Sequence, residues 1–409
     1  MQVLYPRCAG LDVHSKLVVA CVRLASGGQI QQEVREFGTN TRDLLELLDW
    51  LSAEAVTHVA MEATGVYWKP VWHVLEGHFE LVLGNAAHMR GVPGRKSDVN
   101  DATWIADLLA HGLIRASFVP PLPVQQLRDL TRTRKQLVRE IVQHTQRIEK
   151  TLEDANLKIT GVITDLLGAS GRAILQGLIA GKTDPQELLA LSTGRLKAKR
   201  SELVEALRGR VTKHHRFLLQ LHLEQIETLQ KAVGRVESYI GEELAPFRAA
   251  AELLSTMPGI SEISAEAIVA EIGLDMARFP TAGHLLSWAC LCPRLEQSAG
   301  KRKSNRTRKG NPWLKTMLVQ AAWAAVKKKD SYLRVQFLRL KGRRGPKKAI
   351  VAVASSMLTA IYHMLRDHVP YRELGPDYLQ QRDKDKLAER LIRKLQRLGV
   401  EVEVRPTAA

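Results

Sequence analysis

The sequence predicts an α/β domain with a mixed sheet at the N-terminus, followed by an all-α region. Three observations support this. Apolar runs of strand length alternate with helical patterns over the first hundred or so residues. Pro120, Pro121 and Pro123 then interrupt the pattern, and the sequence beyond them is long, charged and helical. The chain of 409 residues is also long enough for two or three folded units.

The N-terminal elements are expected in the order β-β-β-α-β-α-β-α. Strands are predicted at 9–13, 17–24, 32–37, 56–61 and 79–83, and helices at 44–51, 67–75 and 100–111. Three consecutive strands followed by alternating helices and strands favour a mixed sheet covered by helices.

Two seams of apolar residues predict long helices beyond the prolines. Both repeat at coiled-coil spacing. The two helices would form either an antiparallel hairpin within one subunit or a coiled coil between subunits, and residues 161–200 show no regular pattern. The first seam is Leu130, Leu137, Ile141 and Ile148, and the second is Leu219, Ile226, Leu229, Val233, Val236 and Ile240.

A compact helical domain is expected from about residue 250. Met257-Pro258-Gly259-Ile260-Ser261 resembles a helix-hairpin-helix turn, whose free N–H groups suit a DNA phosphate, although such turns also join helices in proteins that never touch DNA. The apolar stretch from Ala349 to Leu365 contains four polar residues, which favours a buried helix over a membrane span. The predicted domains are therefore 1–120, 121–249 and 250–370, with a charged tail at 371–409 that holds one short helix.

The charge balance points to a polyanion as partner. The formal net charge is +17 and the sequence pI is about 9.8, which favours nucleic acid over a solubilising surface or an anionic membrane. The first residues lack the pattern of a secretory signal. Four cysteines without CxxC spacing exclude a typical zinc site and a disulfide scaffold. We therefore expect a cytoplasmic protein with reduced cysteines.

Four acidic residues stand where predicted elements end or begin. Asp12 and Glu62 end strands, while Asp98 and Asp101 stand three residues apart at the start of a helix, on one helix face. Carboxylates gathered in this way can hold Mg²⁺, and two ions can clamp the attacking and leaving oxygens of a phosphodiester. Each residue also has an ordinary interpretation. Asp12 could be a turn residue and Glu62 a hydrogen-bonding acid, while Asp98 could cap the helix and Asp101 be an acid of its first turn.

A basic segment surrounds Ser298. Because no apolar periodicity follows Leu295, we expect an exposed loop. A hydroxyl among cations suits attack on a phosphate, since the cations hold the DNA backbone and stabilise developing negative charge. Taken alone, the segment favours the simpler interpretation of a nucleic-acid-binding loop in which Ser298 is a turn residue. Its cations are Lys301, Arg302, Lys303, Arg306, Arg308 and Lys309.

A second basic cluster precedes the last apolar helix. It includes Arg343, Arg344 and Lys347, flanked by Lys341 and Lys348. The cluster is expected to contact a nucleic-acid backbone, with a solvated helix face as the alternative.

At these residues the chain resembles a known family: DEDD-type insertion-sequence transposases, relatives of Piv-type DNA invertases that are described as bridge-RNA-guided recombinases. The matching segments cover most of the chain from Gly10 to about Arg366. Each segment alone is unspecific, but the ordered set is specific. In chain order they are GLDVHSK, AMEATGVYW, KSDVNDA with IADLLAHG, LLSTMPGIS, SWACLCPR, SAGKRKS and RKGNPWLK.

The resemblance implies a RuvC-like (ribonuclease H-like) domain, a helical coiled-coil linker and a C-terminal helical transposase domain. It implies that Asp12, Glu62, Asp98 and Asp101 form a metal-binding tetrad for two Mg²⁺ ions, with Mn²⁺ as an alternative. Ser298 matches the serine that forms a covalent phosphoserine link with DNA. The serine of one subunit would meet the acids of another in a dimer or tetramer.

The implied partners are double-stranded donor and target DNA and a structured noncoding guide RNA, in the bacterial nucleoid and away from membranes. Two departures from the family pattern affect the serine segment. The family usually has two glycines after the serine, where this chain has Ala299-Gly300, and Cys290 replaces a frequent glycine. Alanine resists positive φ, so the turn after Ser298 must differ or depend on Gly300 alone.

Three functions follow as hypotheses. The leading one is RNA-guided DNA strand exchange through a serine adduct. A RuvC-like nuclease or junction resolvase would use the same acids with water as nucleophile. A nucleic-acid-binding scaffold would use the basic segments without catalysis.

Overall fold

The computed structural model describes residues 2–63, 65–85, 89, 101–192, 200–293, 296–298, 301–304, 306–307, 310–379 and 384–402. For 296–298, 301–304 and part of the last helix it describes the backbone alone. The chain divides into two compact units, Met1–Val119 and Pro120–Ala409. The division falls at the proline-rich segment that follows the α/β pattern.

The first unit is built on a five-stranded sheet with strand order β3-β2-β1-β4-β5. Its strands are β1 (Arg7–Val13), β2 (Leu17–Ser26), β3 (Gln29–Gly38), β4 (His58–Glu62) and β5 (Glu80–Gly84). The first three strands pair antiparallel, whereas β4 pairs parallel with both β1 and β5. The predicted mixed sheet is therefore confirmed, together with the order of its elements.

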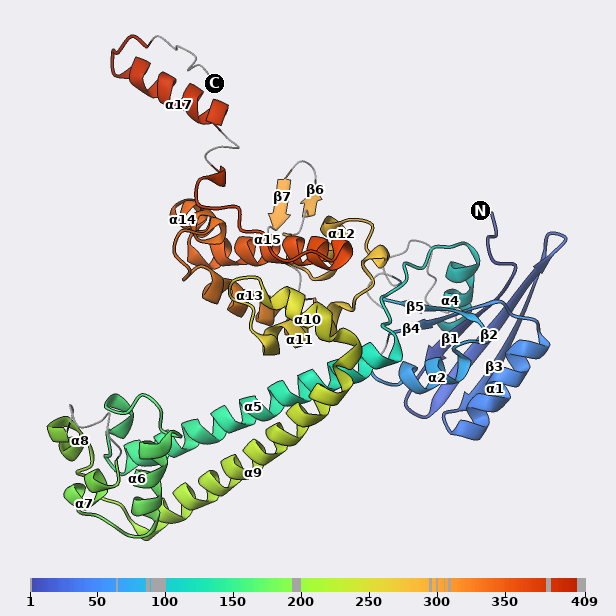
Figure 1. Ribbon diagram of the computed structural model, residues 1–409. Helices are drawn as coiled ribbons and strands as arrows, with labels where there is room; N and C mark the ends of the chain where they lie inside the picture. The colour runs from blue at the N-terminus through green and yellow to red at the C-terminus, as the bar shows by residue number, and fades with distance from the viewer. Residues whose placement is uncertain are drawn as a thin grey trace. The chain divides into compact units, whose positions relative to one another are not determined.

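Helices cover both faces of this sheet, as Figure 1 shows. On one face, Leu11 and Met61 belong to a core with residues of α1 (Thr41–Ala53) and α2 (Trp68–Leu75). On the other face, Cys8 and Ala60 pack with α4 (Asp101–Ala110). Burial on both faces explains why the middle residues of β1 and β4 are small or apolar, with charged and polar residues only towards the strand ends. The exposed edge strand β3 is instead rich in Gln, Glu and Arg, which discourages pairing with another chain.

The second unit begins with a pair of long helices, α5 (Leu122–Asp154) and α9 (Lys213–Glu243), that run antiparallel along each other. The predicted seams lie between them, with Ile148, Leu219, Ile226 and Ile240 buried. The helices and their pairing within one chain are thus confirmed. A coiled coil between subunits stays a prediction.

Short helices close the far end of this hairpin. They are η1 (Ile159–Gly161), α6 (Ala169–Ile179), α7 (Pro185–Ala190) and α8 (Arg200–Ala206), and they share a core with the adjoining ends of α5 and α9. No regular pattern was recognisable here, because helices of 6 to 11 residues are too short to show a clear apolar period.

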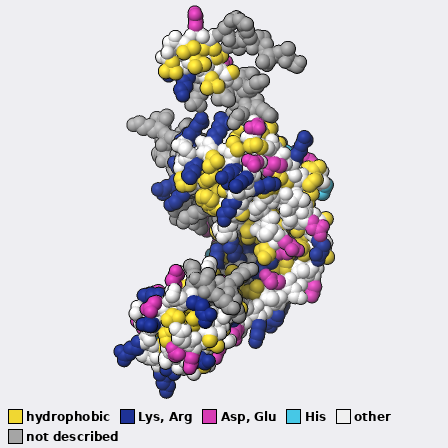
Figure 2. Space-filling view, turned by 60° about the vertical axis from the view of Figure 1, so that its left-hand side comes forward, with side chains coloured by type: hydrophobic (Ala, Val, Ile, Leu, Met, Phe, Trp, Pro, Cys, Tyr) yellow, Lys and Arg dark blue, Asp and Glu magenta, His cyan; other side chains and the backbone are white. Residues whose placement is uncertain are grey.

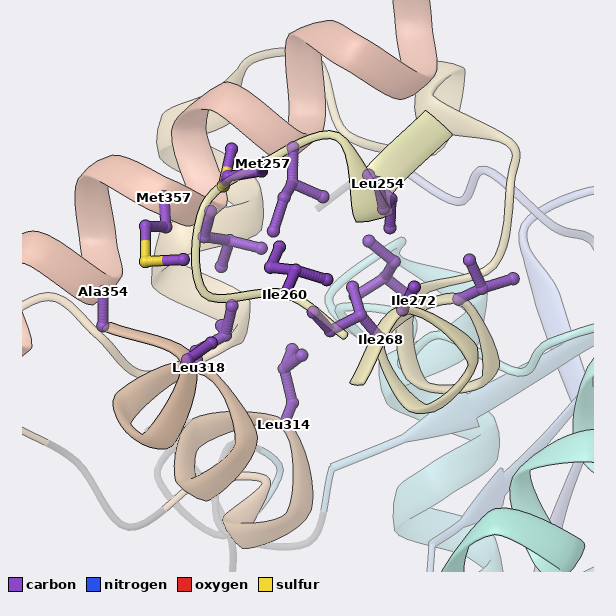
Figure 3. Packing of buried hydrophobic residues seen from close by; sticks show 14 of the residues in the cluster. Leu254, Met257, Ile260, Ile268, Ile272, Leu314, Leu318, Ala354 and Met357 are labelled. Carbon is purple, nitrogen blue, oxygen red and sulfur yellow. The ribbon is translucent and has the colours of Figure 1, made fainter. Parts of the chain in front are cut away.

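The C-terminal core is helical and contains the near ends of α5 and α9 as well. Figure 3 shows Leu254, Ile268, Leu318 and Met357 converging in it. Its helices are η3 (Ala245–Phe247), α10 (Arg248–Ser255), α11 (Glu262–Ile272), η4 (Met276–Arg278), α12 (Ala282–Trp288), α13 (Pro312–Ala325), α14 (Tyr332–Arg344) and α15 (Pro346–Asp367). Beyond it, α17 (Lys384–Arg397) is the short helix expected in the tail.

Helix α15 is long and apolar enough to span a membrane by length and composition alone, but 56% of the qualifying window is buried inside the protein. Val353, Met357 and Ile361 are completely buried in the C-terminal core. The expectation of a buried helix is therefore confirmed.

The turn between α10 and α11 packs against another helix. Gly259 has φ +86°, and a Cβ there would lie 2.3 Å from the backbone oxygen of Ala321 in α13. The N–H groups of Met257 and Ile260 already donate to carbonyls of the same segment, and Ser261 caps α11. This geometry explains the glycine by close packing, and use of the turn for DNA phosphate stays a prediction.

Candidate active site and nucleic-acid-binding surfaces

Asp12 and Glu62 lie at the carboxyl ends of neighbouring parallel strands. In the register of β1 and β4, Leu11 is opposite Met61, so Asp12 and Glu62 follow at the same level. Side chains alternate between the faces of a strand. Since Leu11 and Met61 face α1 and α2, Asp12 and Glu62 are on the face that α4 covers.

Helix α4 carries Asp101 to the same end of the sheet. A Cβ on Gly10 would lie 2.3 Å from the Ala102 oxygen and from the Ala106 nitrogen, so α4 rests directly on β1. The start of β1 lies near the end of α4, where the Leu4 and Tyr5 amides donate to Ala110. The helix therefore runs antiparallel to β1, and its first residue, Asp101, lies beside the strand end that holds Asp12.

An ion pair fixes this helix on the sheet. The buried Arg23 of β2 donates from Nε to Asp107 of α4 at 2.7 Å. Because one partner is almost fully buried, this pair is a geometric constraint rather than a flexible surface contact. The position of Asp101 thus follows from a close backbone approach at Gly10 and an anchored helix.

The carboxylate oxygens of the acids at this end of the sheet are ligands of the kind that Mg²⁺ prefers. Asp12 also accepts a contact from His14 Nε2 at 3.1 Å, and Glu62 and Asp101 have interactions of their own. Within the described residues, no group of three or more His, Cys, Asp or Glu side chains converges closely enough to hold a metal. Asp98 lies outside the described residues, so the tetrad as a whole stays a prediction.

Ser298 is the last residue of a short strand, and the prediction of a loop there was wrong. Strand β6 (Glu296–Ser298) pairs antiparallel with β7 (Lys301–Ser304), with Ser298 opposite Lys301. Backbone hydrogen bonds can pair two strands as short as these without apolar alternation, and the sequence pattern therefore missed the hairpin. Ala299 and Gly300 lie outside the described residues.

The base of this hairpin is joined to the C-terminal core. Pro293 and Thr307 form an isolated bridge, and the Thr307 hydroxyl accepts a hydrogen bond from Lys315 Nζ of α13 at 2.6 Å. Asn311 caps α13 by accepting from the Trp313 and Leu314 amides. The serine strand therefore starts from a fixed support.

The predicted cations are distributed over two places. Lys301, Arg302 and Lys303 lie in β7 and Arg306 follows it, whereas Arg308 and Lys309 lie outside the described residues. Arg343 and Arg344 end α14, and Lys347 is the second residue of α15. All three are exposed, on either side of Gly345. Figure 2 shows many lysine and arginine side chains over the helical part of the chain, with acids among them.

A third cationic region was not recognised from the sequence. On α5, Arg128, Arg132 and Arg134 pair with carboxylates of α11, and Lys135 and Arg139 lie beside Trp313 of α13. Basic residues on a long charged helix look like a solvated face in the sequence. The only available signal was their density, five cations within twelve residues of α5.

Two family models match this chain in separate segments. Residues 9–157 match a DEDD-type IS110 model described as a transposase, and residues 251–337 match the transposase IS116/IS110/IS902 family. Together they cover more than half of the chain, in the order in which the sheet and the helical core occur. The chain belongs to the IS110 family of transposases.

Two relatives are proteins of insertion elements. A protein of insertion element IS900 from Mycobacterium paratuberculosis is 28% identical over 302 residues, which is 68% of this chain and 73% of the relative. A protein of insertion element IS110 from Streptomyces coelicolor is 29% identical over 126 residues, which is 30% of this chain and 31% of that relative.

The two matched segments divide the candidate residues of this IS110-family chain. Asp12, Glu62, Asp98 and Asp101 fall in the first segment, whereas Ser298 and the cations of β7 fall in the second. The acids and the serine therefore belong to different compact units, and any site that uses both requires both units.

Proposed function

We propose that this IS110-family transposase cuts and rejoins DNA, with Ser298 as nucleophile and Asp12, Glu62, Asp98 and Asp101 as ligands of Mg²⁺. The observation that carries the proposal is the meeting of Asp12, Glu62 and the start of α4 at one end of the sheet. Acids from two strand ends and a helix start, far apart in the chain, suit a metal cage better than they suit separate caps and turns.

The topology of the first unit supports a RuvC-like, ribonuclease H-like assignment. Three antiparallel strands followed by two parallel strands, in the order β3-β2-β1-β4-β5, are the arrangement expected of that class. In this arrangement the central strand β1 carries the first acid, and its parallel neighbour β4 carries the second.

The proposed reaction divides the chemistry between the two units. Bound Mg²⁺ would neutralise phosphate charge and stabilise the leaving oxygen. The Ser298 Oγ attacks the scissile phosphorus, so that an Oγ–P bond forms while one P–O bond of the DNA strand breaks, and the serine proton ends on the released hydroxyl. A hydroxyl of another strand then attacks the same phosphorus and restores Ser298. The bond count is unchanged, so rejoining needs no nucleotide cofactor.

The same proposal includes the partners. Double-stranded donor and target DNA would bind the cations of β7 and of the α14–α15 junction through phosphates, which carry little sequence information. Sequence would instead be read by base pairing with a structured guide RNA. The units that bear the acids and the serine would meet between subunits of a dimer or tetramer, in the nucleoid of a bacterial cytoplasm.

A denaturing gel of protein that carries its copurified RNA, incubated with labelled donor and target DNA and Mg²⁺, tests the proposal. We expect a covalent protein–DNA band that Ser298→Ala abolishes and that Ser304→Ala, in the paired strand of the same hairpin, retains. Asp12→Asn should also abolish the band, whereas Asp49→Asn, an exposed acid on α1, should not. Free nicked DNA without a band would indicate water as nucleophile, and intact DNA would indicate a scaffold; either result would refute the proposal.

A further inference from the structure

The second unit contains a cationic pocket of about 400 Å³ where α5, α11 and α13 meet. Cations of α5 line one wall, and Trp313 and Met317 of α13 line another. Among the acids of the candidate site that the structure describes, Asp12, Glu62 and Asp101, none lines this pocket. Some of its cations form ion pairs with carboxylates of the protein, and others do not.

Part of the charge is already neutralised within the protein. The side chain of Glu271 is 3% exposed and accepts hydrogen bonds from Nε and Nη2 of Arg132, at 2.7 and 2.8 Å. It also accepts a hydrogen bond from the side chain of Asn311. Arg134 pairs with Glu266 at 2.8 Å in a buried contact. Bidentate and buried pairs of this kind fix geometry, so they hold α5 against α11 and the start of α13.

Two cations of this wall form no ion pair within the described part of the chain. Lys135 Nζ is buried and has no hydrogen-bond partner there. Arg139 has no carboxylate partner there either and lies with its guanidinium 5.1 Å from the centre of the Trp313 ring. Burial lowers the pKa of Lys135, and the charge of Arg139 adds to this effect against the opposing charge of Glu271.

A buried ammonium without a partner is unfavourable, and bound anions commonly explain such groups. The wall opposite is aromatic and apolar. Arg132 and Arg139 both approach the Trp313 ring, at 5.6 and 5.1 Å. An anion joined to a flat or apolar group therefore fits the pocket better than an isolated ion does.

We propose that this pocket binds a phosphate of a nucleic-acid backbone through Lys135 and Arg139, with the adjoining sugar or base against Trp313. The inference rests on the proposed function, because a strand-exchanging enzyme meets polynucleotides as its main polyanions. Glu237 of α9 lines the same pocket and is exposed. Its negatively charged carboxylate repels a phosphate and therefore weakens binding.

Direct binding to the full chain tests this inference without any strand cleavage. The Ser298→Ala chain is used in EDTA, with labelled single-stranded RNA, single-stranded DNA and duplex DNA of one sequence as separate probes and an acidic peptide as a fourth. We compare Lys135→Gln/Arg139→Gln with Lys231→Gln/Arg235→Gln, which removes two exposed cations of α9 that do not line the pocket.

The pocket variant should weaken binding of at least one nucleic acid by about tenfold or more, as expected for two charge-assisted contacts. It should also reduce the slope of log affinity against log salt by about one to two. The control pair should change affinity only slightly, and Glu237→Gln should tighten binding. The probe that responds most identifies RNA or DNA as the source of the phosphate.

Equal binding by the pocket variant and the control pair would overturn the inference, as would an effect on the acidic peptide alone. Because Glu237→Gln is predicted to strengthen binding, a folding defect cannot imitate that result. The same pocket substitutions in a chain that keeps Ser298 separate the two proposals. A serine adduct that persists there would leave the proposed function intact, and a pocket effect on binding in a chain that forms no adduct would leave this inference intact.

Discussion

At the scale of single residues, Cys290 shows how the backbone selects a residue type. Its φ is +55°, in the region that glycine adopts most easily. A glycine would adopt this conformation without the strain that the cysteine side chain brings. Gly310, with φ +49°, packs against it, and a Cβ on Gly310 would lie 2.4 Å from Cys290 Cβ and 2.5 Å from Cys290 Sγ.

A double-mutant cycle tests this contact. Cys290→Gly should be neutral or stabilise the protein by up to about 1 kcal/mol, since relief of backbone strain is partly offset by the entropy of the unfolded chain. Gly310→Ala should destabilise it by about 1–3 kcal/mol through overpacking. In the Cys290→Gly background that loss should shrink, because the clashing atoms are gone. Urea unfolding measures all three variants, and strictly additive effects would contradict the predicted contact.

The sequence allowed a candidate residue to be recognised where that residue ends a strand or helix. It did not allow this where the role of the residue depends on its neighbours in the folded structure. Asp12 and Glu62 were recognisable because each follows an apolar strand. Lys135 and Arg139 were not, because only the folding of α11 and α13 against α5 distinguishes them from solvated cations. The role of Asp98 is still an expectation from the resemblance.

At the scale of elements, the position of α4 depends on Gly10. No side chain fits there, because the helix backbone lies 2.3 Å from the site of a Cβ. Gly10→Ala should therefore move α4 off β1 and destabilise the first unit by several kcal/mol, roughly the upper range for overpacking. The proposed metal site should be lost with it.

The matched control is a glycine with free space around it. Gly241→Ala in α9 meets no atom within 4 Å and should stabilise the second unit by about 0.5–1 kcal/mol, as in an ordinary helix. Hydrogen exchange of the α4 amides separates the two effects. Unchanged protection of α4 in Gly10→Ala would show that the helix does not depend on this close approach.

The hairpin of α5 and α9 contains a histidine pair from which we predict a pH-dependent stability. The two Nδ1 atoms of His144 and His222 are 3.3 Å apart, and Arg147 donates to His144 Nε2. Since arginine only donates, His144 carries its proton on Nδ1 and donates to His222. Burial lowers the pKa of His144, and the charge of Arg147 lowers it further, against the opposing charge of Glu140. Burial also lowers the pKa of His222, and His144 and Arg147 add to that effect.

These shifts set the sign of the pH effect. The unfolded chain binds protons near the ordinary value of 6.5 while the folded pair resists them. Stability from the neutral pair is therefore complete above about pH 6.5 and is lost as the pH falls through the lowered pKa values. His144→Gln/His222→Gln should flatten this dependence in thermal unfolding, and His214→Gln, an exposed site on α9, should not. Identical pH profiles for the two would refute the assignment.

Long elements were predictable from the sequence and short ones were not. Helices of 31 and 33 residues show their apolar period over many turns, whereas the hairpin of β6 and β7 is made by backbone pairing that leaves no such trace. The serine strand therefore appeared to be a loop.

At the scale of the whole molecule, the acids and the serine lie in separate units, and we expect them to meet between subunits. A mixture of Asp12→Asn and Ser298→Ala chains should then regain adduct formation, because one chain supplies intact acids and the other an intact serine. The matched control is the double variant mixed with either single variant, which leaves one of the two groups missing from every site. If each single variant stays inactive in the mixture although the chains associate, the site must form within one chain.

The most direct test of the account is to locate the covalent link. Protein that has reacted with DNA and Mg²⁺ is digested with nuclease and protease, and mass spectrometry identifies the residue that keeps a nucleotide. The account predicts a nucleotide on Ser298, absent without Mg²⁺ and absent in Asp12→Asn. A nucleotide on Ser304 or on any other residue would contradict it, as would cleaved DNA that leaves no nucleotide on the protein.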